Sequence, residues 1–171
     1  MINRLVFQSA ELWVNINHFP VYLKMLAFYI LQVILHAMSS RVLFVIYDNG
    51  AYDQIFPMGV GALSAVLKTQ GHEMSFWHQD IHHWPDGDLT DYLDKNKFDV
   101  VILSLIGGYY QYTKMKNLSK AINNSKNRSN FKYVMGGYGP TPEPEFFLKK
   151  SGCDVVCLGE GEITVSKIMN A

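Results

Sequence analysis

The chain has 171 residues, of which 49% are hydrophobic and 18% are charged. This length favours one globular domain with a substantial core, and the composition excludes a disordered chain. Lys and Arg together number 15, as do Asp and Glu, so the balance of charge gives no electrostatic case for a nucleic-acid partner.

The first 40 residues differ from the rest. Residues 21–37 are almost wholly apolar, interrupted only by Lys24, Gln32 and His36. Such a run is at the short limit of a membrane span. A membrane anchor, a partner-docking helix and sequence upstream of the true start therefore compete as interpretations. We favour the third, because a strand-like run follows Met38 almost at once. Residues 1–37 are expected to lie outside the fold, and residues 38–171 to form the domain.

From Arg41 onward, strand-like and helix-like segments alternate. Strands are expected at 42–47, 73–79, 100–106, 131–135 and 154–158, and helices at 58–70, 89–95, 109–122, 143–150 and 162–169. The first strand is a continuous apolar run, which is typical of a strand buried on both faces. Residues 123–130 are polar and predict a solvated connection. The alternation predicts a flavodoxin-like or Rossmann-like three-layer α/β sandwich, with five parallel strands in the order 2-1-3-4-5.

Glycine and polar residues follow the strands. In an open α/β sheet the ligand lies at the carboxyl ends, where the strand order reverses, here between the first and third strands. Glycine lets the backbone approach a ligand closely. Turns of this fold need glycine in any case, but three glycine-bearing loops on one edge favour a large, flat or elongated ligand. The candidates in these loops are Asp48, Asn49, Ser104, Leu105, Gly107, Gly108, Gly136, Gly137, Gly159, Glu160 and Gly161.

Residues 41–171 resemble the cobalamin-binding domain found at the N-terminus of many cobalamin-dependent radical S-adenosylmethionine enzymes. The resemblance rests on short pieces in the same order and spacing, of which the last is the most specific. These pieces are Pro57-Met58-Gly59-Val60-Gly61-Ala62-Leu63, Gly71-His72, Asp80, Phe98-Asp99-Val100-Val101, Gly136-Gly137, and Asp154-Val155-Val156 leading into Gly159-Glu160-Gly161-Glu162. Gly59, at the start of the first helix, joins the candidate cofactor-binding residues through this resemblance.

The wider cobalamin-binding fold carries an Asp-x-His-x-x-Gly loop whose histidine ligates cobalt, then Ser-x-Leu, then Gly-Gly. Ser104 matches the serine and Gly136-Gly137 the pair, with Ile106 in the leucine place. The loop from Asp48 to Gly61 contains no histidine, as in many radical-enzyme members. The resemblance therefore implies base-off cobalamin without a protein histidine ligand. It also implies a serine hydroxyl near the nucleotide tail and a channel at the two glycines that a larger side chain would fill.

The histidines after the second strand and the two cysteines are interpreted as structural residues rather than as ligands of a metal or cluster. The run from His82 to Pro85, with His78 nearby, predicts a surface loop rather than a metal site. Cys153 and Cys157 have the first spacing of a radical-enzyme cluster motif, but Glu160 stands where the third cysteine would fall. We therefore interpret both as buried structural thiols. They do not make a disulfide framework, and a cytoplasmic location fits them best.

The chain alone is expected to catalyse nothing, because an iron–sulfur cluster needs a third cysteine. That cluster, S-adenosylmethionine and the radical barrel would belong to a domain supplied in cis or in trans. The enzyme class of the parent, a radical methyltransferase or a related enzyme, stays open. The alternative is a stand-alone flavodoxin-like or degenerate domain that acts as an interaction module without a cofactor. Ser104 disfavours a phosphorylated receiver, and the lack of Ser and Thr in residues 48–57 disfavours a flavin site.

Overall fold

The computed structural model describes residues 20–23, 25–26, 29–30, 39–50, 56–106 and 109–169, with the backbone alone at 109 and 110. The chain divides into two compact units, residues 1–38 and residues 39–171. Described residues from 21 to 30 are helical, and most of their side chains are exposed. Nowhere in the described ranges is a helix both long and apolar enough to cross a membrane. That residues 1–37 lie outside the fold stays a prediction.

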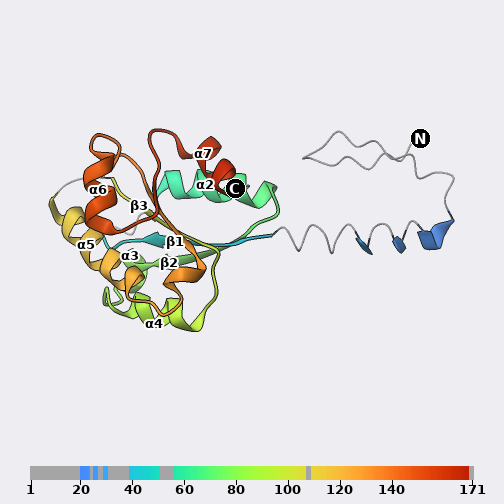
Figure 1. The fold of residues 1–171 in the computed structure, drawn as a ribbon, viewed down its shortest axis with the longest axis horizontal. Helices are drawn as coiled ribbons and strands as arrows, with labels where there is room; N and C mark the ends of the chain where they lie inside the picture. The colour runs from blue at the N-terminus through green and yellow to red at the C-terminus, as the bar shows by residue number, and fades with distance from the viewer. Residues whose placement is uncertain are drawn as a thin grey trace. The chain divides into compact units, whose positions relative to one another are not determined.

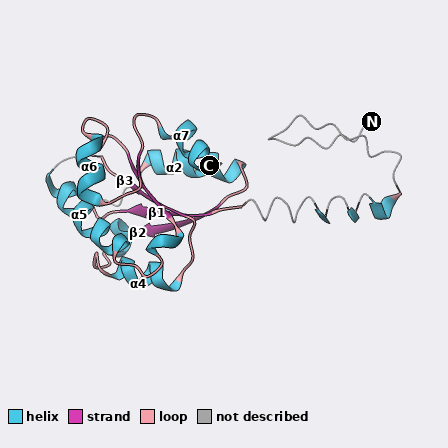
Figure 2. Ribbon diagram, viewed as in Figure 1, coloured by secondary structure: helices cyan, strands magenta, loops and turns pink. Residues whose placement is uncertain are grey.

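The second unit is built on one parallel sheet, shown in Figure 2. Its strands hydrogen-bond in the order β2-β1-β3-β4-β5, which confirms the predicted order. Every residue of β1 except the first is buried, because neighbouring strands flank it and helices cover both of its faces. The strands are β1 (Arg41–Ile46), β2 (Glu73–His78), β3 (Val100–Ser104), β4 (Lys132–Gly136) and β5 (Val155–Val156).

Helices cover the two faces of the sheet, so the predicted three-layer sandwich is confirmed (Figure 1). Helices α2 and α7 pack on one face, and α4, α5 and α6 pack on the other. The helices are α2 (Met58–Thr69), α3 (Gln79–His82), α4 (Asp88–Lys95), α5 (Tyr109–Asn123), α6 (Pro144–Ser151) and α7 (Gly161–Met169), with a 3-10 turn η1 at Arg128–Asn130.

Alternate residues of each strand supply the two halves of the core. In β3, Val100 and Ile102 join the apolar cluster under α2 and α7, whereas Val101 and Leu103 join the larger cluster under α4, α5 and α6. By this alternation Ser104, the last residue of β3, falls on the α2 and α7 side of the sheet. The site prediction therefore concerns this layer.

Three local predictions agree with the structure only in part. His82, which was expected in the loop, is the last residue of the short helix α3, and His83 follows it in the left-handed conformation with a φ of 52°. Strand β5 contains only two residues, fewer than the five expected. The polar stretch after α5 is not simply solvated, because Asn127 and Arg128 hydrogen-bond backbone carbonyls of other elements.

Candidate functional site

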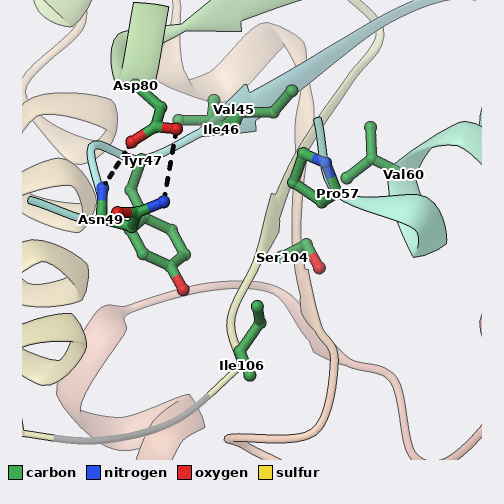
Figure 3. Close-up of a pocket in the computed structure, with 9 residues that line it drawn as sticks. All are labelled: Val45, Ile46, Tyr47, Asn49, Pro57, Val60, Asp80, Ser104 and Ile106. Atoms are coloured by element: carbon green, nitrogen blue, oxygen red, sulfur yellow. Dashed lines mark hydrogen bonds between the residues drawn. The ribbon is translucent and has the colours of Figure 1, made fainter. Parts of the chain in front are cut away.

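A pocket of about 120 Å³ lies at the carboxyl edge of the sheet, where the chain leaves β1 and β3 (Figure 3). This is the point at which the strand order reverses, so the pocket occupies the place where open α/β sheets bind ligands. Apolar side chains form most of the wall, and a few polar groups interrupt it. The lining residues are Val45, Ile46, Tyr47, Asn49, Pro57, Val60, Asp80, Ser104 and Ile106.

Asn49 and Asp80 form one end of this pocket and fix the loop after β1 (Figure 3). The backbone N–H of Asn49 donates to Asp80 Oδ1 at 3.0 Å, and its side-chain amide donates to Oδ2 at 3.3 Å. Asp80 is only 1% exposed, and a buried carboxyl group needs such donors. Next to it, burial raises the pKa of the Tyr47 hydroxyl above its ordinary value.

Asp48 makes contacts that are separate from this pair. Its carboxylate accepts the N–H of Gly50 at 2.8 Å and lies 3.0 Å from Nδ1 of His83. Burial alone would raise the pKa of Asp48, but the hydrogen bonds from His83 and Gly50 outweigh it and lower the pKa. Asp48 therefore anchors the loop to the end of α3 and does not line the pocket.

Ser104 and Gly136 lie side by side as paired residues of β3 and β4. The Ser104 hydroxyl lines the pocket, and no hydrogen bond to it is found among the residues that the structure describes. A Cβ atom built on Gly136 would lie 3.4 Å from Cβ of Cys157, so a side chain larger than methyl would crowd this strip of the sheet. Burial raises the pKa of the Cys157 thiol, which keeps it neutral.

The loops after β3 and β4 contact each other at Leu105 and Gly137. This contact, rather than a ligand channel, explains why residue 137 is glycine. Gly137 has a φ of 101°, and a Cβ atom there would collide with the backbone carbonyl of Leu105. The N–H of Leu105 donates to Gly136 O at 2.9 Å, and the N–H of Gly139 donates to Leu105 O at 3.1 Å. The backbone conformation requires glycine at 137 whether or not a ligand binds.

The remaining candidates do not line the pocket. A Cβ atom built on Gly59 or Gly159 would contact nothing within 4 Å, although Gly159 has a φ of 68°. Glu160 is exposed in the loop before α7. A Cβ atom on Gly161 would lie 3.0 Å from Leu63 in α2, so this glycine serves close helix packing. Two further candidates, Gly107 and Gly108, lie outside the described residues.

His78, at the end of β2, is buried, and no hydrogen bond to either of its ring nitrogens is found among the residues that the structure describes. Its ring centroid lies 5.8 Å from that of Phe56, and burial lowers its pKa. A neutral imidazole without a hydrogen bond is costly in a core. His78 is nonetheless not among the residues that line the pocket.

A network of hydrogen bonds surrounds Asp86 on the face of the sheet that α4, α5 and α6 cover. Lys114 and Gln79 donate to its Oδ1 at 2.8 and 2.6 Å, and Asn117 donates to Oδ2 at 2.9 Å. Burial would raise the pKa of Asp86, but these donors lower it. The buried Gln79 also accepts the N–H of Asp48 at 3.2 Å, so the network reaches the loop after β1.

Seven pocket residues were absent from the candidates predicted from sequence: Val45, Ile46, Tyr47, Pro57, Val60, Asp80 and Ile106. Asp80 carried a usable signal, because an acid directly after a strand reaches the same edge as Asp48 and Ser104. The apolar residues carried none, since apolar residues at strand and helix ends are usually core.

A sequence-family model, the B12 binding domain, matches residues 46–169. No curated protein matches the chain, whereas solved structures do. The radical S-adenosylmethionine methyltransferase TsrM from Kitasatospora setae, solved with cobalamin and a 4Fe–4S cluster bound, is 18% identical with a TM-score of 0.64. A cobalamin-binding protein from Desulfitobacterium hafniense is 15% identical with a TM-score of 0.58, over 76% of this chain and 58% of that one.

The receiver domain of the sensor histidine kinase PA1611 from Pseudomonas aeruginosa is similar at a TM-score of 0.52, with 10% identity over 77% of this chain and 95% of that one. At these identities, structural likeness establishes the fold alone. The chain covers 26% of the TsrM chain, which covers 78% of this one. Because the family match spans most of the chain, this protein belongs to the B12-binding domain family. The predicted family resemblance is confirmed, and the expectation of cobalamin as cofactor agrees with it.

Proposed function

We propose that this domain binds cobalamin base-off and presents it to radical S-adenosylmethionine chemistry carried out by another domain. The observation that supports this most directly is the pairing of Ser104 with Gly136 at the strand-order switch, beside a pocket. The solved TsrM structure combines a domain of this fold with cobalamin and an iron–sulfur cluster in one longer chain. The bound cobalamin supplies methyl-transfer or redox chemistry, while the protein supplies binding and orientation.

The residues present suit a nucleotide tail in two ways. Ser104 lines a mostly apolar pocket, and its hydroxyl, which has no hydrogen-bond partner among the described residues, is available to donate to and accept from a ligand. Gly136 leaves bare backbone on the same strip of the sheet, where a larger side chain would meet Cys157. We assign these two residues to the tail, with Asn49 and the loop after β1 at the adjoining pocket.

We also propose that no histidine of this chain ligates cobalt. The loop after β1, residues 47–57, contains no histidine. His78 is buried close to Phe56. His83 is held by Asp48. The alternative function, an interaction module without a cofactor, keeps the same fold but requires that cobalamin fails to bind.

Titration with hydroxocobalamin, followed by visible absorption and calorimetry, tests the site. We expect saturable binding to the wild type, progressive loss in Gly136→Ala and Gly136→Val, and a loss of about fivefold in Ser104→Ala, which corresponds to about 1 kcal/mol for one hydrogen bond. Gly87→Ala is the matched control, because Gly87 is not a candidate cofactor-binding residue and a Cβ atom there contacts nothing within 4 Å. Absence of binding to the wild type would establish the alternative.

Electron paramagnetic resonance of the bound cobalt(II) form tests the lower face. We expect no superhyperfine splitting from an axial nitrogen. Splitting that persists when the dimethylbenzimidazole is absent, as in bound cobinamide, and disappears in a histidine variant would show that a protein ligand exists. His78→Phe and His83→Gln are the two variants to examine, because these side chains lie nearest the loop after β1.

A further inference from the structure

Positive and negative charges are segregated along the chain. Residues 73–99 contain seven acids and two lysines, whereas residues 109–150 contain eight Lys or Arg and two acids. Two of these eight cations are neutralised within the domain, because Lys114 and Arg128 form ion pairs with aspartates. The others include the exposed lysines of α5 and α6, so a chain of zero net charge carries a basic surface on these two helices.

Four exposed lysines make up this surface, and none of them forms an ion pair with an acid of the described chain. Acids are scarce beside them. Helix α5 contains none, and α6 contains only Glu145, in its first turn. The lysines are Lys116 and Lys120 on α5 and Lys149 and Lys150 on α6.

Two aromatic side chains join the lysines of the two helices. The rings of Tyr112 and Phe146 stack with centroids 5.9 Å apart, where α5 and α6 lie side by side (Figure 1). Lys116 Nζ lies 5.9 Å from the centre of the Tyr112 ring, and Lys150 Nζ lies 6.0 Å from that of Phe146. Side chains four residues apart share one face of a helix. The lysine–aromatic patch is therefore a continuous surface made of Tyr112, Lys116, Lys120, Phe146, Lys149 and Lys150.

We propose that the lysine–aromatic patch docks this domain on an anionic lipid surface. The charge of the patch complements lipid phosphates, and clustered lysines bind such headgroups. Phe146 is 40% exposed and Leu148 is 41% exposed, so apolar side chains accompany the charge, as they do on helices that lie at a bilayer interface. All four cations are lysines, which are depleted from protein–protein interfaces, where arginine is enriched. This composition favours lipid over an acidic protein.

The patch is separate from the carboxyl edge of the sheet. Helices α5 and α6 lead back to the amino ends of β4 and β5, and they end beside each other, where Asn123 Nδ2 donates to Ser151 O at 2.7 Å. Lys120, Lys149 and Lys150 therefore lie toward the amino edge. A docked domain keeps its candidate cofactor site open, and the inference does not depend on the proposed binding of cobalamin.

Co-sedimentation of the full chain with extruded vesicles tests the proposal. The vesicles contain phosphatidylcholine alone, or phosphatidylcholine with about one third phosphatidylglycerol. At low salt we expect binding to the anionic vesicles to be about tenfold or more tighter than to the neutral vesicles. This preference should weaken as salt is added, because exposed charges are screened. Adsorption through the apolar residues 21–37 would require neither anionic lipid nor low salt.

Reversal of two charges locates the binding surface. Lys116→Glu combined with Lys150→Glu should weaken binding to the anionic vesicles about tenfold or more, because attraction to the headgroups is replaced by repulsion. Lys68→Glu combined with Lys167→Glu is the matched control. It makes the same change in net charge at exposed positions of α2 and α7, on the opposite face of the sheet, and should bind within about threefold of the wild type.

Four results would overturn the proposal: no binding to anionic vesicles, equal binding to both kinds of vesicle, unchanged binding when Lys116 and Lys150 are reversed, and an equal loss in the control. Binding of soluble poly-glutamate without binding of vesicles would also overturn it and would assign the patch to an acidic protein. Thermal unfolding shows whether the variants fold. If the first variant does not fold, the lipid and salt comparisons with the wild type still decide the matter.

Discussion

The amino and carboxyl edges of the sheet handle their polar groups in opposite ways. At the amino edge, Arg128 donates to Asn123 Oδ1 at 2.8 Å and to Asp154 Oδ1 at 2.9 Å, and Asp154 Oδ2 accepts the N–H of Tyr133 at 2.7 Å. Asp99 similarly accepts the N–H of Arg41 at 2.7 Å. At the carboxyl edge the Ser104 hydroxyl has no such partner within the described chain, and Ile106 is 62% exposed.

This difference indicates that the amino edge contributes to stability and the carboxyl edge to binding. Polar groups that satisfy one another hold the ends of strands in place, while unsatisfied polar groups and exposed apolar side chains suit an outside partner. Large exposed apolar side chains lie in the loops after the strands, at Phe56, Ile106, Tyr138 and Leu158, and in the first turns of the helices that follow two of these loops, at Met58 and Ile163. Substitutions at the amino edge should therefore change the free energy of unfolding, and substitutions at the carboxyl edge should change affinity.

Gly137→Ala should give the largest loss in the free energy of unfolding. It is an exception to the division between the two edges. Although Gly137 lies at the carboxyl edge, the added methyl group would collide with Leu105 O and occupy a backbone conformation at φ of 101°. We expect a loss of about 3 kcal/mol or more in the free energy of unfolding, measured by urea denaturation. Gly59→Ala, in an open helical position, should cost nothing. A stable Gly137→Ala variant that loses only cobalamin would show that this glycine serves the ligand instead.

Arg128→Ala should give the next largest loss in the free energy of unfolding. It tests whether the amino edge contributes to stability without contributing to binding. It removes charge-assisted hydrogen bonds to Asp154 and Asn123 and two to the backbone carbonyls of Phe131 and Gly152. We expect about 2 kcal/mol of destabilisation, with the affinity of the folded variant for hydroxocobalamin unchanged. Lys149→Ala on the exposed side of α6 is the control. A weakened affinity in folded Arg128→Ala protein would contradict the separation of the two edges.

The smallest expected effect is the pH dependence of the free energy of unfolding that comes from the histidines at the two ends of β2. Burial lowers the pKa of His72 and of His78 in the folded state, so the unfolded chain binds protons more readily near its ordinary value of about 6.5. Stability is therefore fully present above that pH and declines as the pH falls below it toward the folded-state pKa. His78→Phe should make this decline shallower and also remove two ring nitrogens that have no hydrogen bond within the described chain. Urea midpoints that stay constant from about pH 7 to pH 5 in the wild type would contradict this.

Most of the fold was predictable because the three central strands, β1, β3 and β4, are buried over most of their length. Continuous apolar runs such as Val42–Tyr47, separated by helical periodicity, allow few arrangements other than a parallel sheet. The errors fall where tertiary contacts decide local structure. Helix α3 is held by side-chain hydrogen bonds of Gln79 to Trp84 O and Asp86, partners whose proximity no local pattern reveals.

The site was predictable only in its location. The rule for strand-order switches placed it between β1 and β3, and Asn49 and Ser104 do line the pocket there. What the sequence could not distinguish was the reason for each glycine. Leu105 approaches Gly137 closely and Leu63 approaches Gly161 closely, so a Cβ atom would be crowded at both glycines. Those close approaches exist only after the chain has folded.

The contact between Leu63 of α2 and Gly161 of α7 also has a meaning for synthesis of the chain. These helices cover one face of the sheet together, yet β2 to β5 lie between them in sequence. A ribosome adds about 5–20 residues per second, so the Ser104 side of the sheet waits on the order of seconds after β4 is made before α7 can cover it. A nascent chain thus passes through a stage in which α2 is available to cover that face but α7 is not.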